Sequence, residues 1–153
     1  VNVPLLIRPP GGLAPGHRTK QLVSHVDLVP TIVGWCGGDI PAASQGTDIR
    51  ALCEGGDEPV RDGLALEFHS SNWGERPNPL RGWRTCDRKY VAGTEGGDEL
   101  YDLAADPLET RNLIDDPESA SVRRRMAVAL ADWIASTPDS WPQVPMPERE
   151  VER

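Results

Sequence analysis

The stretch GWRTCDRKYVAGTEGGDELYDL, residues 82–103, decides the fold of this chain. Three short runs of residues common in β-strands lie within it, bounded by turn residues: 82–85, 89–92 and 100–103. A similar run at 64–68 precedes them. Strands that follow each other this closely pair antiparallel, because short turns suffice to connect them. The sequence therefore predicts a small antiparallel sheet.

A helix is predicted after the sheet, over residues 117–136. Asp116-Pro117 is typical of a helix start, because the N–H that Pro lacks has no helical partner there. The apolar residues recur at helical spacing and form one stripe: Val122, Met126, Leu130, Trp133 and Ile134. The run Arg123–Arg125 falls largely on the other side, as a solvated face or, less commonly, a site for an anionic partner. We expect the stripe to cover the sheet.

The pattern upstream of the sheet is different. Residues 3–8, VPLLIR, are almost continuously apolar, as in a strand buried on both faces of a parallel sheet. A helix is predicted over 27–36, with Asp27 as its N-cap and Gly37-Gly38 as its end. Its apolar residues share one face: Leu28, Ile32, Trp35 and Cys36. A strand, a loop and a helix in this order are a piece of α/β organisation.

These patterns divide the chain into three parts. The run EGGDEP at 54–59 has the composition of a linker and indicates a domain boundary. We expect residues 1–55 to end a larger α/β domain and 56–137 to form an antiparallel sheet packed on a C-terminal helix. Residues 138–153, rich in Pro and charge, are expected to be extended or disordered. The fold class is therefore α/β passing into α+β.

Composition and charge narrow the possible functions. A net charge of −8 and a pI near 4.8 give no electrostatic basis for binding nucleic acid. No apolar run approaches the roughly 18 residues of a membrane span, and no signal-peptide pattern is present, so we expect a soluble segment. Cys36, Cys53 and Cys86 are widely spaced without a CxxC motif, which argues against a zinc or redox site. The chain begins at Val1 without Met, so we expect polypeptide upstream.

Four segments in a fixed order carry a family resemblance: VPLLIRPPG at 3–11, SHVDLVPTIV at 24–33, RTCDRKYV at 84–91 and ELYDLAADPLETRNL at 99–113. The chain resembles the C-terminal portion of a sulfatase of the alkaline-phosphatase-like superfamily over about residues 1–135. The resemblance implies a large α/β domain followed by a smaller domain of sheet and helix. It also implies a partner, the upstream catalytic portion, through which the sulfate ester is bound.

The chemistry of the family is implied to lie upstream of this chain. Sulfatases use formylglycine, made from the first residue of a C/S-x-P/A-x-R motif, and calcium or another divalent cation. None of the three Cys residues begins such a motif, and no Asp-Asn or Asp-His pair occurs. We therefore assign no catalytic residue, no metal ligand and no cofactor to this chain.

The loop after the 64–68 strand is the candidate for contact with substrate. In sulfatases, loops of the small domain often border the substrate pocket. We expect His69, Asn72 and Trp73 to line the subsite for the alcohol part of the ester, against the alternative of a structured surface loop.

Other polar residues receive structural assignments. His17 and His25 are expected at the surface or in a structural role, and Asp27 as a helix cap rather than a metal ligand. Neighbours in a strand point to opposite faces, so we expect Tyr90 in the core and Lys89 exposed.

Two alternatives to a sulfatase segment stay open. A phosphodiesterase or phosphonate monoester hydrolase can share this C-terminal layout, and only the upstream nucleophile and metal ligands distinguish it. A non-catalytic binding or scaffold domain is the other, and it predicts a self-contained chain that unfolds cooperatively. A segment of a larger enzyme instead predicts exposed apolar side chains at 3–8 and on the 27–36 helix.

Overall fold

The computed structural model describes residues 3–12, 16–68, 79–93 and 97–137. The chain forms two compact units, which divide between Asp62 and Gly63. Each unit is described by itself below. We call Val1–Asp62 unit 1 and Gly63–Arg153 unit 2.

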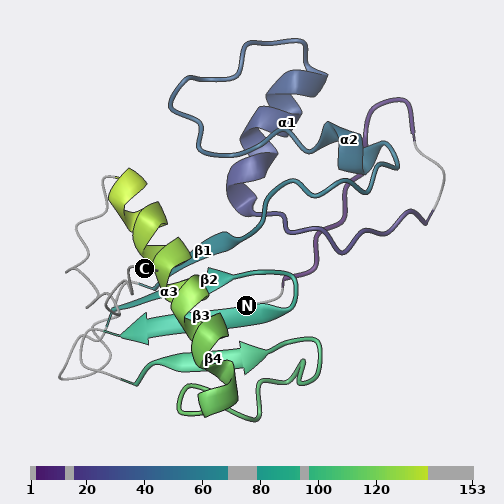
Figure 1. Cartoon of the computed structure of the whole chain (residues 1–153). Coiled ribbons are helices and arrows are strands. Elements are labelled where there is room, and N and C mark those ends of the chain that lie inside the picture. Colours follow the sequence, from purple (N-terminus) through teal and green to yellow (C-terminus); the bar gives the residue numbers. More distant parts are fainter. Residues whose placement is uncertain (1–2, 13–15, 69–78, 94–96, 138–153) are drawn as a thin grey trace, which may run out of the picture. The chain divides into compact units, whose positions relative to one another are not determined.

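Unit 2 contains the predicted antiparallel sheet (Figure 1). Its four strands lie in the order of the sequence: β1 Leu64–Phe68, β2 Leu80–Arg84, β3 Arg88–Gly93 and β4 Glu99–Asp102. Every neighbouring pair is antiparallel, so the predicted strands and their pairing are confirmed. In this register Tyr90 lies opposite Trp83 on one side and Leu100 on the other.

The turn between β2 and β3 follows from two short polar side chains. The Thr85 N–H donates to the Arg88 carbonyl over 2.9 Å, which closes the turn. The Thr85 hydroxyl donates to Asp87 Oδ1 over 2.8 Å and accepts from the Arg88 N–H over 3.0 Å. Side chains that satisfy backbone groups locally favour turns over longer elements, so this segment reverses the chain within four residues.

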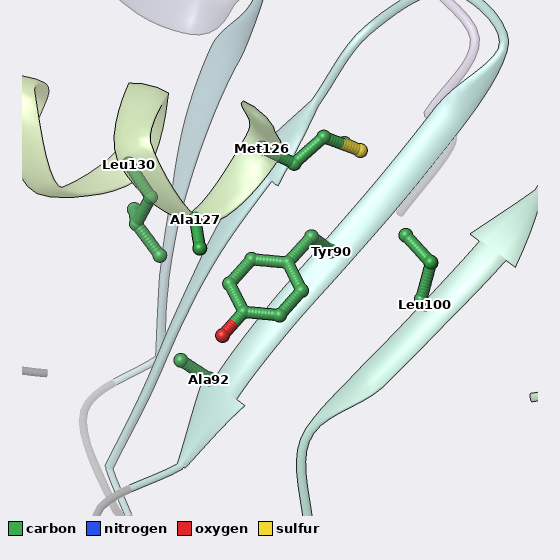
Figure 2. Close-up of a cluster of buried hydrophobic side chains, with 6 residues drawn as sticks. All are labelled: Tyr90, Ala92, Leu100, Met126, Ala127 and Leu130. Carbon is green, nitrogen blue, oxygen red and sulfur yellow. The ribbon is translucent and has the colours of Figure 1, made fainter. Parts of the chain in front are cut away.

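The core of unit 2 lies between one face of the sheet and α3, Ala120–Ser136 (Figure 2). Asp116 caps the preceding single turn, Pro117–Ser119, by accepting the Glu118 N–H. The buried core residues come from the sheet and the helix: Tyr90, Ala92, Leu100, Met126, Ala127 and Leu130. Val122 and Ile134 of the predicted stripe pack against them. The predicted packing of helix on sheet is confirmed.

Unit 1 contains the predicted helix in two parts, a single turn His25–Asp27 followed by α1, Leu28–Trp35. Its end matches the prediction at Gly37-Gly38. Gly37 adopts a φ of 70°, its N–H donates to the Gly34 carbonyl, and the Gly38 N–H donates to the Val33 carbonyl. This pair of hydrogen bonds is typical of helix ends where a Gly takes the left-handed conformation. A further short helix, α2, spans Arg50–Cys53.

The strand predicted over residues 3–8 is absent from the structure. Residues 3–8 belong to no helix or strand, and Leu6 is 96% exposed. A strand buried on both faces needs neighbouring strands for its hydrogen bonds and apolar layers above and below it. The described residues of unit 1 include no strand that supplies them. An apolar composition does not form a strand without such neighbours, so the prediction for residues 3–8 is wrong for this chain.

The linker predicted at 54–59 is hydrogen-bonded to other residues of unit 1. The Thr19 hydroxyl donates to Asp57 Oδ1 over 2.7 Å, and the Gln21 side-chain amide donates to the Asp57 carbonyl over 2.7 Å. Arg61 also pairs with Asp27. These contacts tie Asp57 and Arg61 to unit 1, which ends at Asp62. The assignment of residues 1–55 to a larger α/β domain stays a prediction.

Candidate functional site

The predicted substrate-pocket residues lie outside the part of the chain that the structure describes. His69, Asn72 and Trp73 all fall within residues 69–78. Their role stays a prediction. Among the described residues, no group of three or more His, Cys, Asp or Glu side chains could hold a metal ion. Cys36, Cys53 and Cys86 are not joined in disulfides among the described residues.

The centre of unit 1 is a buried ion pair between Asp27 and Arg61. Asp27 is fully buried, and its two oxygens accept from the Arg61 guanidinium over 2.5 and 2.8 Å. They also accept the N–H groups of Ser24, over 2.7 Å, and Thr47, over 2.8 Å. Asp27 therefore does not cap the first turn of α1 as predicted. It joins the helix entry to two segments that lie far along the chain.

The environment of Asp27 favours its ionised form. Burial by itself raises the pKa of a carboxyl group, but the hydrogen bonds from Arg61, Thr47 and Ser24 outweigh it. The positive charge of Arg61 acts in the same direction, so the pKa of Asp27 lies below its ordinary value. A buried carboxylate that is this fully paired serves as a structural support.

Thr31, one turn further along α1, makes a second connection. Its hydroxyl donates to the Asp27 carbonyl over 2.5 Å and accepts the Ile49 N–H over 3.0 Å. Gly46 lies close by, and a Cβ there would meet the Val26 carbonyl oxygen at 1.9 Å. Asp27 and Thr31 of the SHVDLVPT segment therefore connect α1 to residues 46–49 by hydrogen bonds.

Lys89 in β3 forms a second ion pair, in unit 2. Its ammonium pairs with Glu109 and lies 4.9 Å from the centre of the Tyr101 ring, and the residue is only 8% exposed. The prediction that Lys89 is exposed is wrong, because the loop after β4 brings a carboxylate over it. Glu109 adopts a φ of 58°, a left-handed conformation that costs a residue with a Cβ about 1 kcal/mol. The ion pair with Lys89 offsets this cost.

Tyr90 lies in the core as predicted, and its hydroxyl reaches a polar partner. The hydroxyl donates to Asp98 Oδ2 over 3.0 Å, while Asp98 Oδ1 accepts the Gly93 N–H over 3.2 Å. Burial and the neighbouring carboxylate raise the pKa of Tyr90. The hydroxyl is therefore held neutral, as a donor that ties β3 to the start of β4.

The loop after β4 is fixed by two polar residues of the ELYDLAADPLETRNL segment. Asn112 Oδ1 accepts the N–H groups of Leu100 and Ile114 over 2.9 and 3.1 Å. Asp106 Oδ2 accepts the N–H groups of Thr110 and Arg111 over 2.7 and 2.9 Å. The bond from Arg111, followed by those from Thr110, lowers the pKa of Asp106. These residues hold the loop, and with it Glu109, against the sheet.

One feature of unit 1 is not explained by internal contacts: an exposed apolar surface. We give the name "apolar surface" to six residues of the 3–8 segment and the helix: Val3, Leu5, Leu6, Val26, Val29 and Ile32. On α1, Val29 is 54% and Ile32 55% exposed, whereas Pro30 and Thr31 are buried. The helix thus buries a partly polar side within unit 1 and leaves an apolar side open. Its predicted apolar face includes Ile32, which is exposed, so that face is not the one this chain buries.

No helix among the described residues has the length and apolar character that crossing a bilayer requires. The polar groups of Asp27, Thr31, Lys89, Tyr90 and Asn112 make hydrogen bonds or ion pairs within their own unit.

Comparison with known proteins identifies the family. A family model described as N-sulphoglucosamine sulphohydrolase, C-terminal, matches residues 1–136. An uncharacterized sulfatase of Escherichia coli strain K12, YidJ, is 37% identical in an alignment 139 residues long, and the match covers 87% of this chain and 26% of that protein.

Solved structures of related hydrolases share the fold of this chain. A 2-O GAG sulfatase superposes with a TM-score of 0.64 at 30% identity, over 72% of this chain and 24% of the other. A phosphonate monoester hydrolase of Agrobacterium radiobacter gives a TM-score of 0.64 at 27% identity, over 76% and 25%. This chain spans about a quarter of the length of the curated relatives it matches. It belongs to the family of N-sulphoglucosamine sulphohydrolase C-terminal regions, and so to the sulfatases of the alkaline-phosphatase-like superfamily.

Proposed function

We propose that this chain is the C-terminal segment of a sulfatase-type hydrolase that acts on sulfate esters, with the reacting groups supplied by polypeptide upstream. The observation that carries the proposal is the family match over residues 1–136, in a chain that spans a quarter of its relatives. The motif residues Asp27, Thr31, Lys89 and Asn112 support this division of labour, because each is bonded within its own unit. In this proposal the segment gives the enzyme a folded C-terminal region and a docking surface.

The names of the relatives suggest a class of substrate. The family description concerns a sulphohydrolase of N-sulphoglucosamine, and one structural neighbour is a sulfatase of glycosaminoglycans. We therefore propose that the complete enzyme acts on sulfated carbohydrates.

The formylglycine and divalent cation that the resemblance implies are not supplied by the described residues. No described cluster of His, Cys, Asp or Glu suits a metal ion, and the three Cys residues lack the motif for oxidation. Asp27, which is fully buried, is engaged with Arg61 and two backbone N–H groups. We derive no catalytic step through either group from this chain.

The test of the function compares this chain with the complete enzyme. We expect the complete enzyme to hydrolyse an aryl sulfate and a sulfated glucosamine in the presence of a divalent cation. This chain alone should give the rate of buffer. Metal-dependent turnover by the chain alone would overturn the division between an upstream catalytic portion and a supporting segment.

The loop after β1 is proposed to contribute to the substrate pocket through His69, Asn72 and Trp73. We expect Trp73→Ala in the complete enzyme to raise KM for bulky sulfate esters more than for small ones, because a lost apolar wall matters only where the alcohol group reaches it. Leu108→Ala, at an exposed position of unit 2, is the control. An unchanged KM across several esters would refute this role.

A phosphonate monoester hydrolase is the second candidate, because one such enzyme matches the fold with a TM-score of 0.64 at 27% identity. The sulfatase proposal expects faster turnover, as kcat/KM, of an aryl sulfate than of the matching aryl phosphonate monoester. The opposite ratio in the complete enzyme would favour the phosphonate hydrolase.

A further inference from the structure

The two sequence motifs of unit 2, RTCDRKYV at 84–91 and ELYDLAADPLETRNL at 99–113, meet at one edge of the sheet. The strands lie in the order β1-β2-β3-β4, so β4 is an edge strand with only β3 beside it. A strand edge carries N–H and C=O groups that pair readily with a strand of another chain unless something covers them. An uncovered β4 would therefore make unit 2 prone to association.

The β4 edge is covered by residues 103–113, which we call the strap. In Figure 1 the strap is the green segment that leads from the end of β4 toward α3. The Leu100 N–H donates to Asn112 Oδ1 over 2.9 Å, and the Leu100 carbonyl accepts the Leu113 N–H over 2.8 Å. Alternate residues of an edge strand point their backbone groups away from the sheet. The end of the strap thus satisfies the outward groups at the middle of β4.

The start of the strap is bonded to the same edge. The Asp102 carbonyl accepts the Asp106 N–H over 2.7 Å. Asp106 then shapes the following turn, because its Oδ2 accepts the N–H groups of Thr110 and Arg111. The strap is therefore tied to β4 at both of its ends, and one carboxylate orders the residues between them.

The middle of the strap reaches a face of the sheet through Glu109. Tyr90 lies in the core beneath α3, so its neighbour Lys89 points to the opposite face. There the Lys89 ammonium pairs with Glu109 and lies 4.9 Å from the centre of the Tyr101 ring, and Tyr101 is the partner of Lys89 in β4. The strap thus passes around the β4 edge and is bonded both along the edge and on this face.

Lys89 and Glu109 each depend on the other. Glu109 has a φ of 58°, a left-handed conformation that a residue with a Cβ disfavours. Lys89 is only 8% exposed, and an ammonium group in such a place needs an acceptor. Loss of either charge therefore removes the reason for the strap to stay on this face.

We propose that the strap is a cover for the β4 edge, held closed by the pair of Lys89 and Glu109, and that it prevents this edge from pairing with a second copy of the chain. A second copy presents an identical edge, which can meet the first about a twofold axis. The proposal gives the two motifs one shared task, since Lys89 comes from the first motif and Glu109 and Asn112 from the second. It does not depend on which ester the complete enzyme hydrolyses.

Hydrogen exchange tests the ion pair. Lys89→Met keeps a long side chain at this position and removes its charge. The Leu113 amide should then exchange at least about ten times faster, whereas the amides that pair β2 with β3 keep their rates. Arg84→Met is the matched control, because Arg84 lies opposite Lys89 in β2 and forms no ion pair among the described residues. Equal Leu113 rates in the two variants would overturn the proposal.

Glu109→Gln is a milder variant, since it keeps the shape of the side chain and removes only the charge. The Leu113 amide should again exchange faster than in the unaltered chain. Because both substitutions break the same pair, the combined variant Lys89→Met, Glu109→Gln should exchange about as fast as the faster single variant. Effects that multiply would mean that each residue acts alone, and would reject the pair as the element that holds the strap.

Light scattering after size-exclusion chromatography tests the cover. Lys89→Met combined with Asn112→Ala also removes the acceptor of the Leu100 N–H, so the β4 edge should open. The mass should then rise toward that of a dimer as the concentration is raised, and the Leu100 amide should become more protected. Arg84→Met should keep the mass of the unaltered chain at every concentration.

The amides that pair β2 with β3 show whether this double variant is folded. If they lose protection, the same mass measurement is made on Lys89→Met alone. A folded variant whose Leu113 amide exchanges fast, but whose mass equals that of the unaltered chain at every concentration, would show that the strap does not protect the edge from pairing. That result would overturn the proposed cover.

Discussion

The two units of this chain differ in what they bury. Unit 2 buries six hydrophobic residues between its sheet and α3, and polar contacts then fix the loops around that core. Unit 1 buries Leu22, Ile49 and Leu52, but it also buries the Asp27 carboxylate and the Thr31 hydroxyl. It leaves several large apolar side chains exposed, Leu6, Val29 and Ile32 among them. The hydrophobic core of unit 2 is thus a continuous cluster, whereas unit 1 depends more heavily on buried polar contacts.

Breaking the ion pair of unit 1 should have the largest effect. Arg61→Ala leaves the fully buried Asp27 without its cation, and such a loss costs about 3–5 kcal/mol. We expect the Ile49 amide, which donates to Thr31, to exchange much faster. The Leu100 amide in unit 2 should be unchanged.

The control for this substitution is Arg50→Ala. Arg50 pairs with Asp48 over 2.8 Å, but its side chain is 41% exposed, so its loss should cost less than about 1 kcal/mol. If Arg50→Ala and Arg61→Ala open unit 1 equally, the buried pair is not what holds it.

Removing core volume from unit 2 should have the next largest effect. Leu130 is 1% exposed and packs with Met126 and Tyr90 in the core, so Leu130→Ala leaves a cavity. We expect a loss of about 2–4 kcal/mol in the free energy of unfolding of unit 2, measured by urea denaturation. The hydrogen-exchange rate of the Ile49 amide in unit 1 should not change. A matching loss of protection in unit 1 would mean that the two units unfold as one.

Asp27 in unit 1 and Tyr90 in unit 2 should also respond to opposite extremes of pH. The pKa of Asp27 is lowered in the folded state, so its contribution to stability is present above the unfolded pKa of about 3.8. This contribution is lost as pH falls through the lower folded value, and unit 1 should therefore open in acid. The pKa of Tyr90 is raised, so its contribution is present below about 10 and is lost as pH rises through the folded value.

The measurement is hydrogen exchange of the Ile49 and Leu100 amides across pH, corrected for the intrinsic exchange rates. It checks the predicted loss of stability in acid and in alkali. Asp27→Asn should remove the acid transition of unit 1, and Tyr90→Phe the alkaline transition of unit 2. If acid opens both units at the same pH, carboxylates of unit 2 are equally important, and the contrast between the units fails.

The sequence predicted unit 2 far better than unit 1, for a physical reason. The strands and α3 are specified by local periods and turn residues, such as Thr85 and Asp116, and their core partners lie nearby along the chain. The partner of Asp27 is Arg61, 34 residues away, and that of Lys89 is Glu109, across a loop. No local pattern indicates such pairs. The strand predicted at 3–8 failed for a related reason, because a strand depends on neighbours that periodicity does not reveal.

The smallest effect is expected on the apolar side of α1. Ile32→Ala shortens an apolar side chain as much as an Ile→Ala substitution in a core does. Ile32, however, is 55% exposed in this chain. The change in the free energy of unfolding should therefore stay within about 0.5 kcal/mol, and binding of a hydrophobic dye should fall because exposed apolar area is lost. Urea denaturation of the isolated chain, with Leu130→Ala beside it, measures the contrast directly. If Ile32→Ala lowers the free energy of unfolding as much as Leu130→Ala does, this chain already covers the apolar side of α1. Unit 1 would then be as self-contained as unit 2.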